Sequence, residues 1–252
     1  MLGLQSTART IAAGAAALFC LTAPALADEP REFSWSFTLA GTSDYIFRGL
    51  SLNGEDPAFQ PSINMSYGIF YAGLWASNVD GAGYAPVEVD AYAGIKPVWG
   101  PATFDFGVVY YAYPGGDPGG TFGLDYVEFK AGVSGSPFKN FTVTPVLWFT
   151  PDQENYQETY TIESTFAYAL NPIGIFTPTV SALIGYTESE DIGLFALADD
   201  NYTYWNAGIA LAVEKFTFDF RYWDTNLDQG AGDIYTGLSD ERFVFTASIT
   251  LP

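Results

Sequence analysis

The residues of this sequence that could do chemistry are charged side chains spaced two apart in segments that are otherwise apolar and aromatic. Glu88 and Asp90 flank Val89, and Asp219 and Arg221 flank Phe220. Residues two apart on a β-strand project from the same face of the sheet. Each pair would therefore present its charges to one face, where they could form ion pairs, bind ions or set the selectivity of a channel.

Several residue types that enzymes use are missing. The sequence contains no histidine and a single cysteine, Cys20. Without histidine neither a Ser-His catalytic set nor the commonest transition-metal ligand is available. The formal net charge of −20 disfavours nucleic acid as a partner, because the phosphate backbone repels an acidic surface. We therefore expect a protein that is not an enzyme, has no metal site and needs no cofactor.

The first 27 residues have the pattern of a cleavable secretory signal. Arg9 ends a short basic region, an apolar stretch rich in Ala and Leu begins at Ile11, and Ala25-Leu26-Ala27 supplies the small residues of a cleavage site. We predict a Sec signal peptide at 1–27, which would remove Cys20, and a single exported domain at 28–252.

Twelve segments of that domain alternate between apolar and polar residues. Most are 10 to 14 residues long, which exceeds the usual length of about 5–6 for soluble strands and suits tilted strands that cross a bilayer. They are 33–48, 59–68, 70–79, 87–98, 102–113, 122–134, 141–150, 157–170, 175–187, 202–213, 216–225 and 241–251.

The connectors between these segments alternate in length. Those after the even-numbered segments are short, such as Glu214-Lys215, and those after the odd-numbered ones are longer and richer in Gly and acids, such as 188–201. Bacterial outer-membrane barrels have this layout, with the short turns in the periplasm. We predict an all-β fold, a transmembrane antiparallel up-and-down β-barrel of about 12 strands, with both termini on the periplasmic side.

A soluble β-sandwich would show the same alternation, so the aromatic residues are needed to decide between the two folds. Rings such as Trp99, Phe138 and Tyr222 gather near the ends of the segments. Two aromatic girdles are typical of barrels whose rings lie at the lipid headgroups on each side of the membrane. The pattern therefore favours the barrel and a location in the outer membrane of a Gram-negative bacterium.

In a barrel, the polar face of each segment points into the lumen. Seven acids and five bases are predicted to line it: Asp44, Arg48, Glu88, Asp90, Lys96, Asp105, Glu128, Lys130, Glu163, Asp219, Arg221 and Arg242. Two interpretations stay open for these residues. They could form ion-pair ladders that brace and fill the interior, or they could line a narrow channel and set its selectivity.

The most distinctive local string is Ser43-Asp44-Tyr45-Ile46-Phe47-Arg48-Gly49-Leu50-Ser51. If 33–48 is one strand, Asp44 and Arg48 share a face about 13 Å apart, so we expect each to pair with neighbouring strands. The string resembles the hallmark of the TorF family of porins in Gram-negative outer membranes. Further strings that resemble this family are 71–79, 88–94 and 239–245. The resemblance spans the mature chain and implies an outer-membrane barrel.

The function that we expect is an outer-membrane porin-like channel for passive diffusion of small hydrophilic solutes, with a preference for cations. The alternative is a non-conducting structural or adhesive barrel whose acidic loops bind divalent ions or surface partners. Expected partners are outer-membrane lipid and lipopolysaccharide, and the barrel-assembly machinery. The last strand ends in Leu251-Pro252 rather than in an aromatic residue. The oligomeric state is not predicted by any of these patterns.

Overall fold

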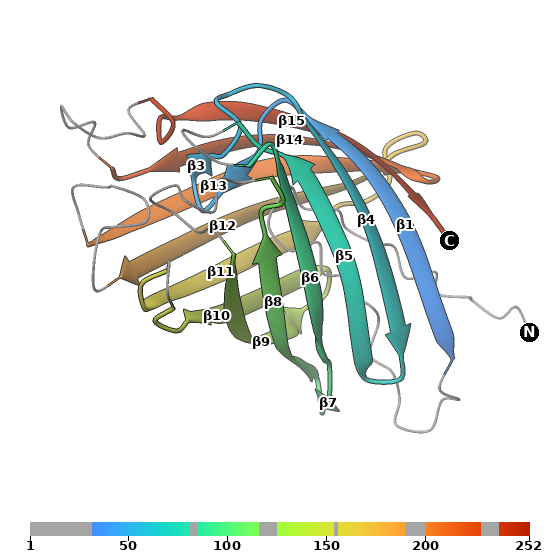
Figure 1. Cartoon of the computed structure of the whole chain (residues 1–252). Coiled ribbons are helices and arrows are strands. Elements are labelled where there is room, and N and C mark those ends of the chain that lie inside the picture. Colours follow the sequence, from blue (N-terminus) through green and yellow to red (C-terminus); the bar gives the residue numbers. More distant parts are fainter. Residues whose placement is uncertain (1–31, 81–84, 116–124, 154–155, 190–199, 228–236) are drawn as a thin grey trace, which may run out of the picture.

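A computed structural model describes residues 32–80, 85–115, 125–153, 156–189, 200–227 and 237–252 of the chain. The predicted signal peptide, 1–27, lies outside this part. Within the described residues, thirteen strands form one antiparallel sheet, which closes on itself because β6 also pairs with β8. β7 is only a two-residue extension beside β8, so the ring itself has twelve strands, as predicted. Figure 1 shows the closed ring.

The strands have the following bounds. They are β1 Phe33–Thr42, β2 Ile46–Phe47, β3 Leu50–Ser51, β4 Ala58–Tyr67, β5 Phe70–Asn78, β6 Val87–Ile95, β7 Val98–Trp99, β8 Ala102–Ala112, β9 Tyr126–Phe138, β10 Phe141–Thr150, β11 Thr159–Ala169, β12 Thr177–Ser189, β13 Asn201–Val213, β14 Phe216–Thr225 and β15 Arg242–Leu251. No helix in the described part of the chain is long and apolar enough to cross a membrane.

Alternation along each strand divides the side chains between the inside and the outside of the ring. On β14, Phe216 and Phe220 are 45% and 48% exposed, whereas Asp219 and Arg221 between and beyond them are buried. A closed barrel gives alternate residues to its two surfaces. The outer surface is therefore apolar and the interior polar, which is the reverse of a soluble globular protein.

Most strand boundaries agree with the sequence prediction. The bounds of β10 and β14 coincide with the predicted segments, and β9 continues four residues beyond the predicted end at Ser134, to Phe138. The turn that follows is therefore the two-residue Lys139-Asn140, with Asn140 at φ 65°. Asn tolerates this left-handed conformation better than most residues, which explains why the turn lies there.

The first segment differs from the prediction. β1 ends at Thr42, and residues 43–57, which we call the inner segment, leave the sheet and enter the barrel before β4 begins. In Figure 1 the short blue strands β2 and β3 of this segment lie within the ring. The single strand 33–48 was therefore a wrong prediction, and Asp44 and Arg48 do not share a strand face.

The reason is a tight turn at Arg48-Gly49. Both residues have positive φ, 50° and 86°, as in the two-residue turn that joins the strands of a hairpin. Gly49 also passes close to the wall, the twelve ring strands. A Cβ at this position would lie 2.5 Å from Thr225 Cγ2 and 2.9 Å from Tyr204 Cβ. Only glycine satisfies both the backbone conformation and the close approach.

Candidate functional site

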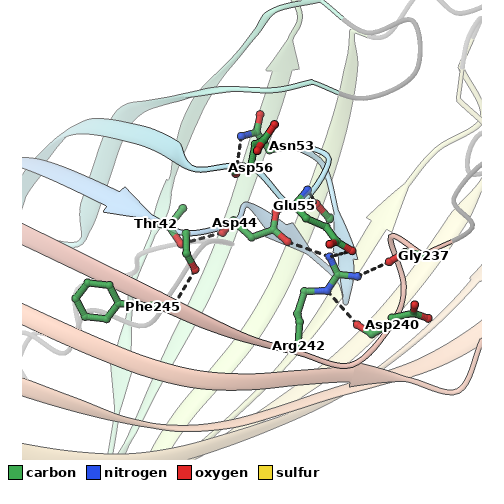
Figure 2. A network of polar contacts seen from close by, with 11 residues as sticks. Thr42, Asp44, Asn53, Glu55, Asp56, Gly237, Asp240, Arg242 and Phe245 are labelled. Atoms are coloured by element: carbon green, nitrogen blue, oxygen red, sulfur yellow. Dashed lines mark hydrogen bonds and ion pairs between the residues drawn. The ribbon is translucent and has the colours of Figure 1, made fainter.

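The inner segment is held in the barrel by Arg242, the first residue of β15. One guanidinium nitrogen, Nη1, lies 3.0 Å from Asp44 Oδ2 and 3.3 Å from Glu55 Oε1. The remaining nitrogens donate to the backbone carbonyls of Gly237, at 2.7 Å, and Asp240, at 3.0 Å. Figure 2 shows this arrangement, in which one arginine joins the inner segment to the final connector of the barrel.

Asp44 is the first acid of the inner segment and is fixed at both oxygens. Ser51 Oγ donates to Asp44 Oδ1 at 2.7 Å, so the carboxylate also closes the β2–β3 hairpin. Thr42 Oγ1 donates to the backbone carbonyl of Asp44 at 2.8 Å. Burial raises the pKa of Asp44, while the hydrogen bonds from Ser51 and Arg242 partly oppose the rise. Asp44 therefore acts as a structural anchor rather than as an open lumen charge.

Two asparagines hold the far end of the inner segment. Asn53 Nδ2 donates to the carbonyls of Asp56 and Pro57, at 2.8 and 2.9 Å, and Figure 2 shows the first of these bonds. Asn78 Nδ2, at the end of β5, donates to Asn53 Oδ1 at 3.2 Å. Side-chain amides thus replace the ladder bonds that this irregular backbone lacks.

The tip of the inner segment carries a buried ion pair. Arg48 Nη2 donates to Glu128 Oε1 of β9 at 2.6 Å, and both side chains are at most 3% exposed. The guanidinium carbon also lies 4.7 Å from the ring centroid of Phe47 and 5.9 Å from that of Trp148. Burial lowers the pKa of Arg48, but Glu128 and the nearby tyrosines Tyr204, Tyr156 and Tyr111 together hold that pKa well above its ordinary value. Arg48 is therefore a permanent cation inside the barrel.

A tyrosine next to this pair ties the inner segment to another strand. Tyr45 donates to Glu88 Oε1 of β6 at 2.6 Å. Burial first, and the Glu88 carboxylate second, raise the pKa of Tyr45 well above its ordinary value, so it stays a neutral donor. The inner segment consequently contacts β6 through Tyr45, β9 through Arg48 and β15 through Asp44.

Other charges form networks within the wall itself. Asp105 accepts from Lys130 at 2.7 Å and from Tyr71 at 2.8 Å, with Lys96 Nζ at 3.9 Å. Trp148 and Tyr204 donate to the two oxygens of Glu163 at 2.9 and 2.6 Å. None of these five partners of Asp105 and Glu163 belongs to the inner segment.

On β14, Arg221 binds a residue of its own strand. Its Nε and Nη2 donate to the two carboxylate oxygens of Asp219 at 3.0 and 2.9 Å. Nη1 also donates to Asn206 Oδ1 at 2.6 Å and Nη2 to Ser181 Oγ at 3.0 Å. This guanidinium therefore joins three neighbouring strands, β12, β13 and β14.

All twelve sequence-predicted lumen residues are buried or half-buried, and none is exposed. The structure pairs every base among them with an acid: Arg48 with Glu128, Lys96 and Lys130 with Asp105, Arg221 with Asp219, and Arg242 with Asp44. Within the described residues, Glu88, Asp90 and Glu163 have no basic partner, and no group of acids has a metal-binding arrangement.

Sequence reasoning missed four residues that build this site: Tyr45, Ser51, Asn53 and Glu55. All four lie in the inner segment, and they were missed because that segment was taken for the end of a strand and the start of an outer loop. The signal that could have revealed it is Arg48-Gly49, a two-residue turn signal between Ile46-Phe47 and Leu50-Ser51, four residues of which all but Ser51 are apolar.

Comparisons with known proteins agree with the architecture. A family model described as a bacterial protein of unknown function (Gcw_chp) matches residues 25–251. No curated protein matches the sequence. Among solved structures, the NanC porin has a TM-score of 0.58 at 10% identity, with 86% of this chain and 99% of that chain covered.

Two further solved structures have lower scores. LpxR from Salmonella typhimurium has a TM-score of 0.48 at 10% identity and covers 86% of this chain and 99% of its own. The outer-membrane channel DcaP of Acinetobacter baumannii has a TM-score of 0.47 at 10% identity, covering 91% of this chain and 100% of its own. At these identities the likeness to NanC shows a shared barrel fold alone.

Proposed function

The chain belongs to the Gcw_chp family of bacterial proteins of unknown function, and from that premise we propose that it is an outer-membrane channel for passive diffusion of small hydrophilic solutes, with a preference for cations. Within that assignment it is a TorF-type porin, exported by the signal peptide at 1–27. An apolar outer surface and a polar interior support a location in lipid, since a barrel in water would require the opposite arrangement.

The preference for cations rests on one observation, the charge balance of the interior. Every predicted lumen base is neutralised by a carboxylate at 3.9 Å or less, whereas Glu88, Asp90 and Glu163 have no basic partner within the described residues. Unpaired carboxylates give the lumen a negative potential, which concentrates cations and repels anions. The inner segment narrows this lumen, which restricts passage to small solutes.

The test is a recording from purified protein in a planar bilayer under a gradient of KCl. We expect discrete conductance steps and a reversal potential of the sign for K⁺ selectivity. A double change, Asp90→Asn with Glu163→Gln, should shift that potential toward zero. Asp152→Asn is the matched control, because Asp152 is exposed and lies outside the strands. A reversal potential that favours chloride would contradict the cation preference.

The location has its own test, independent of conductance. Expressed in a Gram-negative host, the protein should fractionate with the outer membrane together with lipopolysaccharide, and its N-terminal residue should be Asp28. Depletion of the barrel-assembly machinery should lower its yield there. Recovery in the soluble periplasmic fraction would contradict the proposal.

A second candidate function is a non-conducting structural or adhesive barrel. The burial of the inner segment favours it, because Tyr45, Ile46, Leu50 and Ser51 are each at most 2% exposed. The acidic connectors that would bind divalent ions or surface partners fall largely on 190–199 and 228–236, outside the described residues. A folded barrel that gives no conductance steps, even after Arg242→Gln loosens the inner segment, would support this alternative. An enzymatic function is not proposed, since the chain has no histidine.

A further inference from the structure

The Glu128 carboxylate is held by residues of the wall in addition to Arg48 of the inner segment. Thr150 Oγ1 of β10 donates to Glu128 Oε1 at 3.0 Å, and Tyr111 of β8 donates to Oε2 at 3.1 Å. Tyr111 also stacks on Tyr126 with ring centroids 4.3 Å apart. The carboxylate is therefore held in place by three wall strands, whatever occupies the space in front of it.

The surroundings of Glu128 are acidic and aromatic. Asp90 of β6 pairs in register with Tyr111, and its Oδ1 is buried without a hydrogen-bond partner among the described residues. Lys130 lies two residues along β9, but its ammonium binds Asp105 at 2.7 Å. Trp148 presents its ring to the same space. Such a site favours a cation that also has a flat face.

The occupant in the structure has this chemistry, and it comes from outside the wall. The Arg48 guanidinium donates to Glu128 through Nη2 and lies over the ring of Trp148 in the wall and that of Phe47 in its own segment. Its buried Nη1 has no hydrogen-bond partner among the described residues. Arg48 reaches the site only because the hairpin turn Arg48-Gly49 projects it from the inner segment. A guanidinium is thus already shown to fit, with one donor left over.

We propose that the wall around Glu128 is a binding site for guanidinium-bearing solutes and that Arg48 occupies it as an internal competitor. This inference rests on the proposed channel function only in so far as a solute must reach the site through the lumen. A guanidinium fits better than an ammonium because its planar donors match a carboxylate while its faces stack on rings. An anion is disfavoured by the acids around the site.

Chemical rescue of an emptied site tests the proposal. Arg48→Ala should lower the melting temperature, and methylguanidinium at low millimolar concentration should raise it by roughly 2–4 °C if the ligand is present at a few times its Kd. Wild type should not respond, because Arg48 fills the site. The double variant Arg48→Ala, Glu128→Gln should not respond either, and methylammonium should rescue Arg48→Ala less than methylguanidinium does.

Several outcomes would overturn the proposal: no rescue of Arg48→Ala, equal rescue of the double variant, or equal rescue by methylammonium. If Arg48→Ala does not assemble, Arg48→Gln, which removes the guanidinium but keeps a shorter polar side chain, takes the same test. The melting temperature can be measured whether or not the barrel conducts. Rescue in a barrel that never conducts would therefore support the guanidinium site and contradict the proposed channel function. A conducting barrel without rescue would do the opposite.

A second readout uses the channel itself. Methylguanidinium added to Arg48→Ala channels in a bilayer should reduce their K⁺ current at concentrations that leave wild-type current unchanged. Adding Glu128→Gln should abolish this block. A block that is the same in wild type and in both variants would reject the site, because it would then lie elsewhere in the lumen.

Discussion

Two buried ion pairs in this barrel look alike and differ in what they connect. Arg221 and Asp219 are two residues apart on β14, so their pair lies entirely within the wall. Arg48 and Glu128 are 80 residues apart, and their pair joins the inner segment to β9. The first arginine cannot leave the interior without unfolding a strand. The second can leave with a short segment that is outside the sheet. The same chemistry therefore braces the wall at one place and holds a removable element at the other.

The largest effect is expected at the pair in the wall. Asp219→Asn leaves the Arg221 guanidinium buried without its counter-charge, which costs about 3–5 kcal/mol when a buried pair is broken from one side. Denaturant unfolding in detergent micelles measures this loss. Asp56→Asn, at an exposed position of the inner segment, should change stability by less than about 0.5 kcal/mol. Equal losses for the two variants would contradict a bracing role for the Asp219–Arg221 pair.

A weaker and more local effect is expected at the pair that holds the inner segment. Glu128→Gln removes the counter-charge of Arg48, but the segment can relieve the cost by moving into water. Leu50 is 0% exposed, so a Leu50→Cys probe would be buried. Removal of the predicted signal peptide leaves no other cysteine in the chain. We expect a water-soluble thiol reagent to label it about 10–100 times faster in the Glu128→Gln background, while global stability falls less than for Asp219→Asn. Unchanged labelling would mean that the segment is as fixed as the wall.

Substitution of Arg242, which holds the inner segment through Asp44 and Glu55, should have a smaller effect than substitution of Glu128. Arg242→Gln removes the ion pair to Asp44 and the weaker one to Glu55, which is 58% exposed and therefore screened by water. If the inner segment inside the barrel loses about 1–2 kcal/mol of stability relative to its released state, the released fraction should rise roughly 5–30-fold. In bilayer recordings this would be seen as a larger open fraction. Arg242→Lys should fall between wild type and glutamine. Fewer openings than in wild type would contradict a holding role for Arg242.

The smallest effect concerns pH. Burial raises the pKa of Asp44 above its ordinary value of 3.8 while the segment is inside, and release into water would restore that value. The inner state then binds more protons than the released state, so a fall in pH stabilises the inner state and a rise through the raised pKa favours release. Open probability should therefore increase with pH across this acidic window, by less than about tenfold per unit. Asp44→Asn should remove the dependence, and an opposite slope would contradict the assignment to Asp44.

Sequence alone predicts the wall well because a barrel wall depends on a local rule. The alternation of side chains between two faces can be recognised in the sequence of each strand alone. Connector lengths likewise alternate between the two ends of the barrel. Eleven of the twelve ring strands begin and end within four residues of their predicted bounds, with Phe141–Thr150 and Phe216–Thr225 at their predicted bounds, whereas β1 ends six residues early. The polar face of each strand could likewise be read without knowing its neighbours.

The inner segment could not be predicted in this way because its conformation depends on contacts distant in sequence. Its residues continue the alternation of β1, so period alone assigns them to the same strand. What removes them from the sheet is the close approach of Gly49 to Tyr204 and Thr225, and the partners Glu88, Glu128 and Arg242 on three other strands. Partner choice among the twelve lumen charges was unpredictable for the same reason.

The seam where the ring closes has a consequence for assembly. β1 and β15 pair over six residues, from Phe37 with Leu251 to Thr42 with Thr246. Two hydrogen bonds extend the contact: the Ser43 N–H donates to the Phe245 carbonyl, and the Phe245 N–H donates to Ser43 Oγ. The Asp44–Arg242 pair lies immediately beyond these bonds. The first strand can meet the last only when the rest of the chain has been added, so this contact forms late. The Asp44–Arg242 attachment can then form only as the barrel closes, so this end of the inner segment is fixed in the last step of assembly.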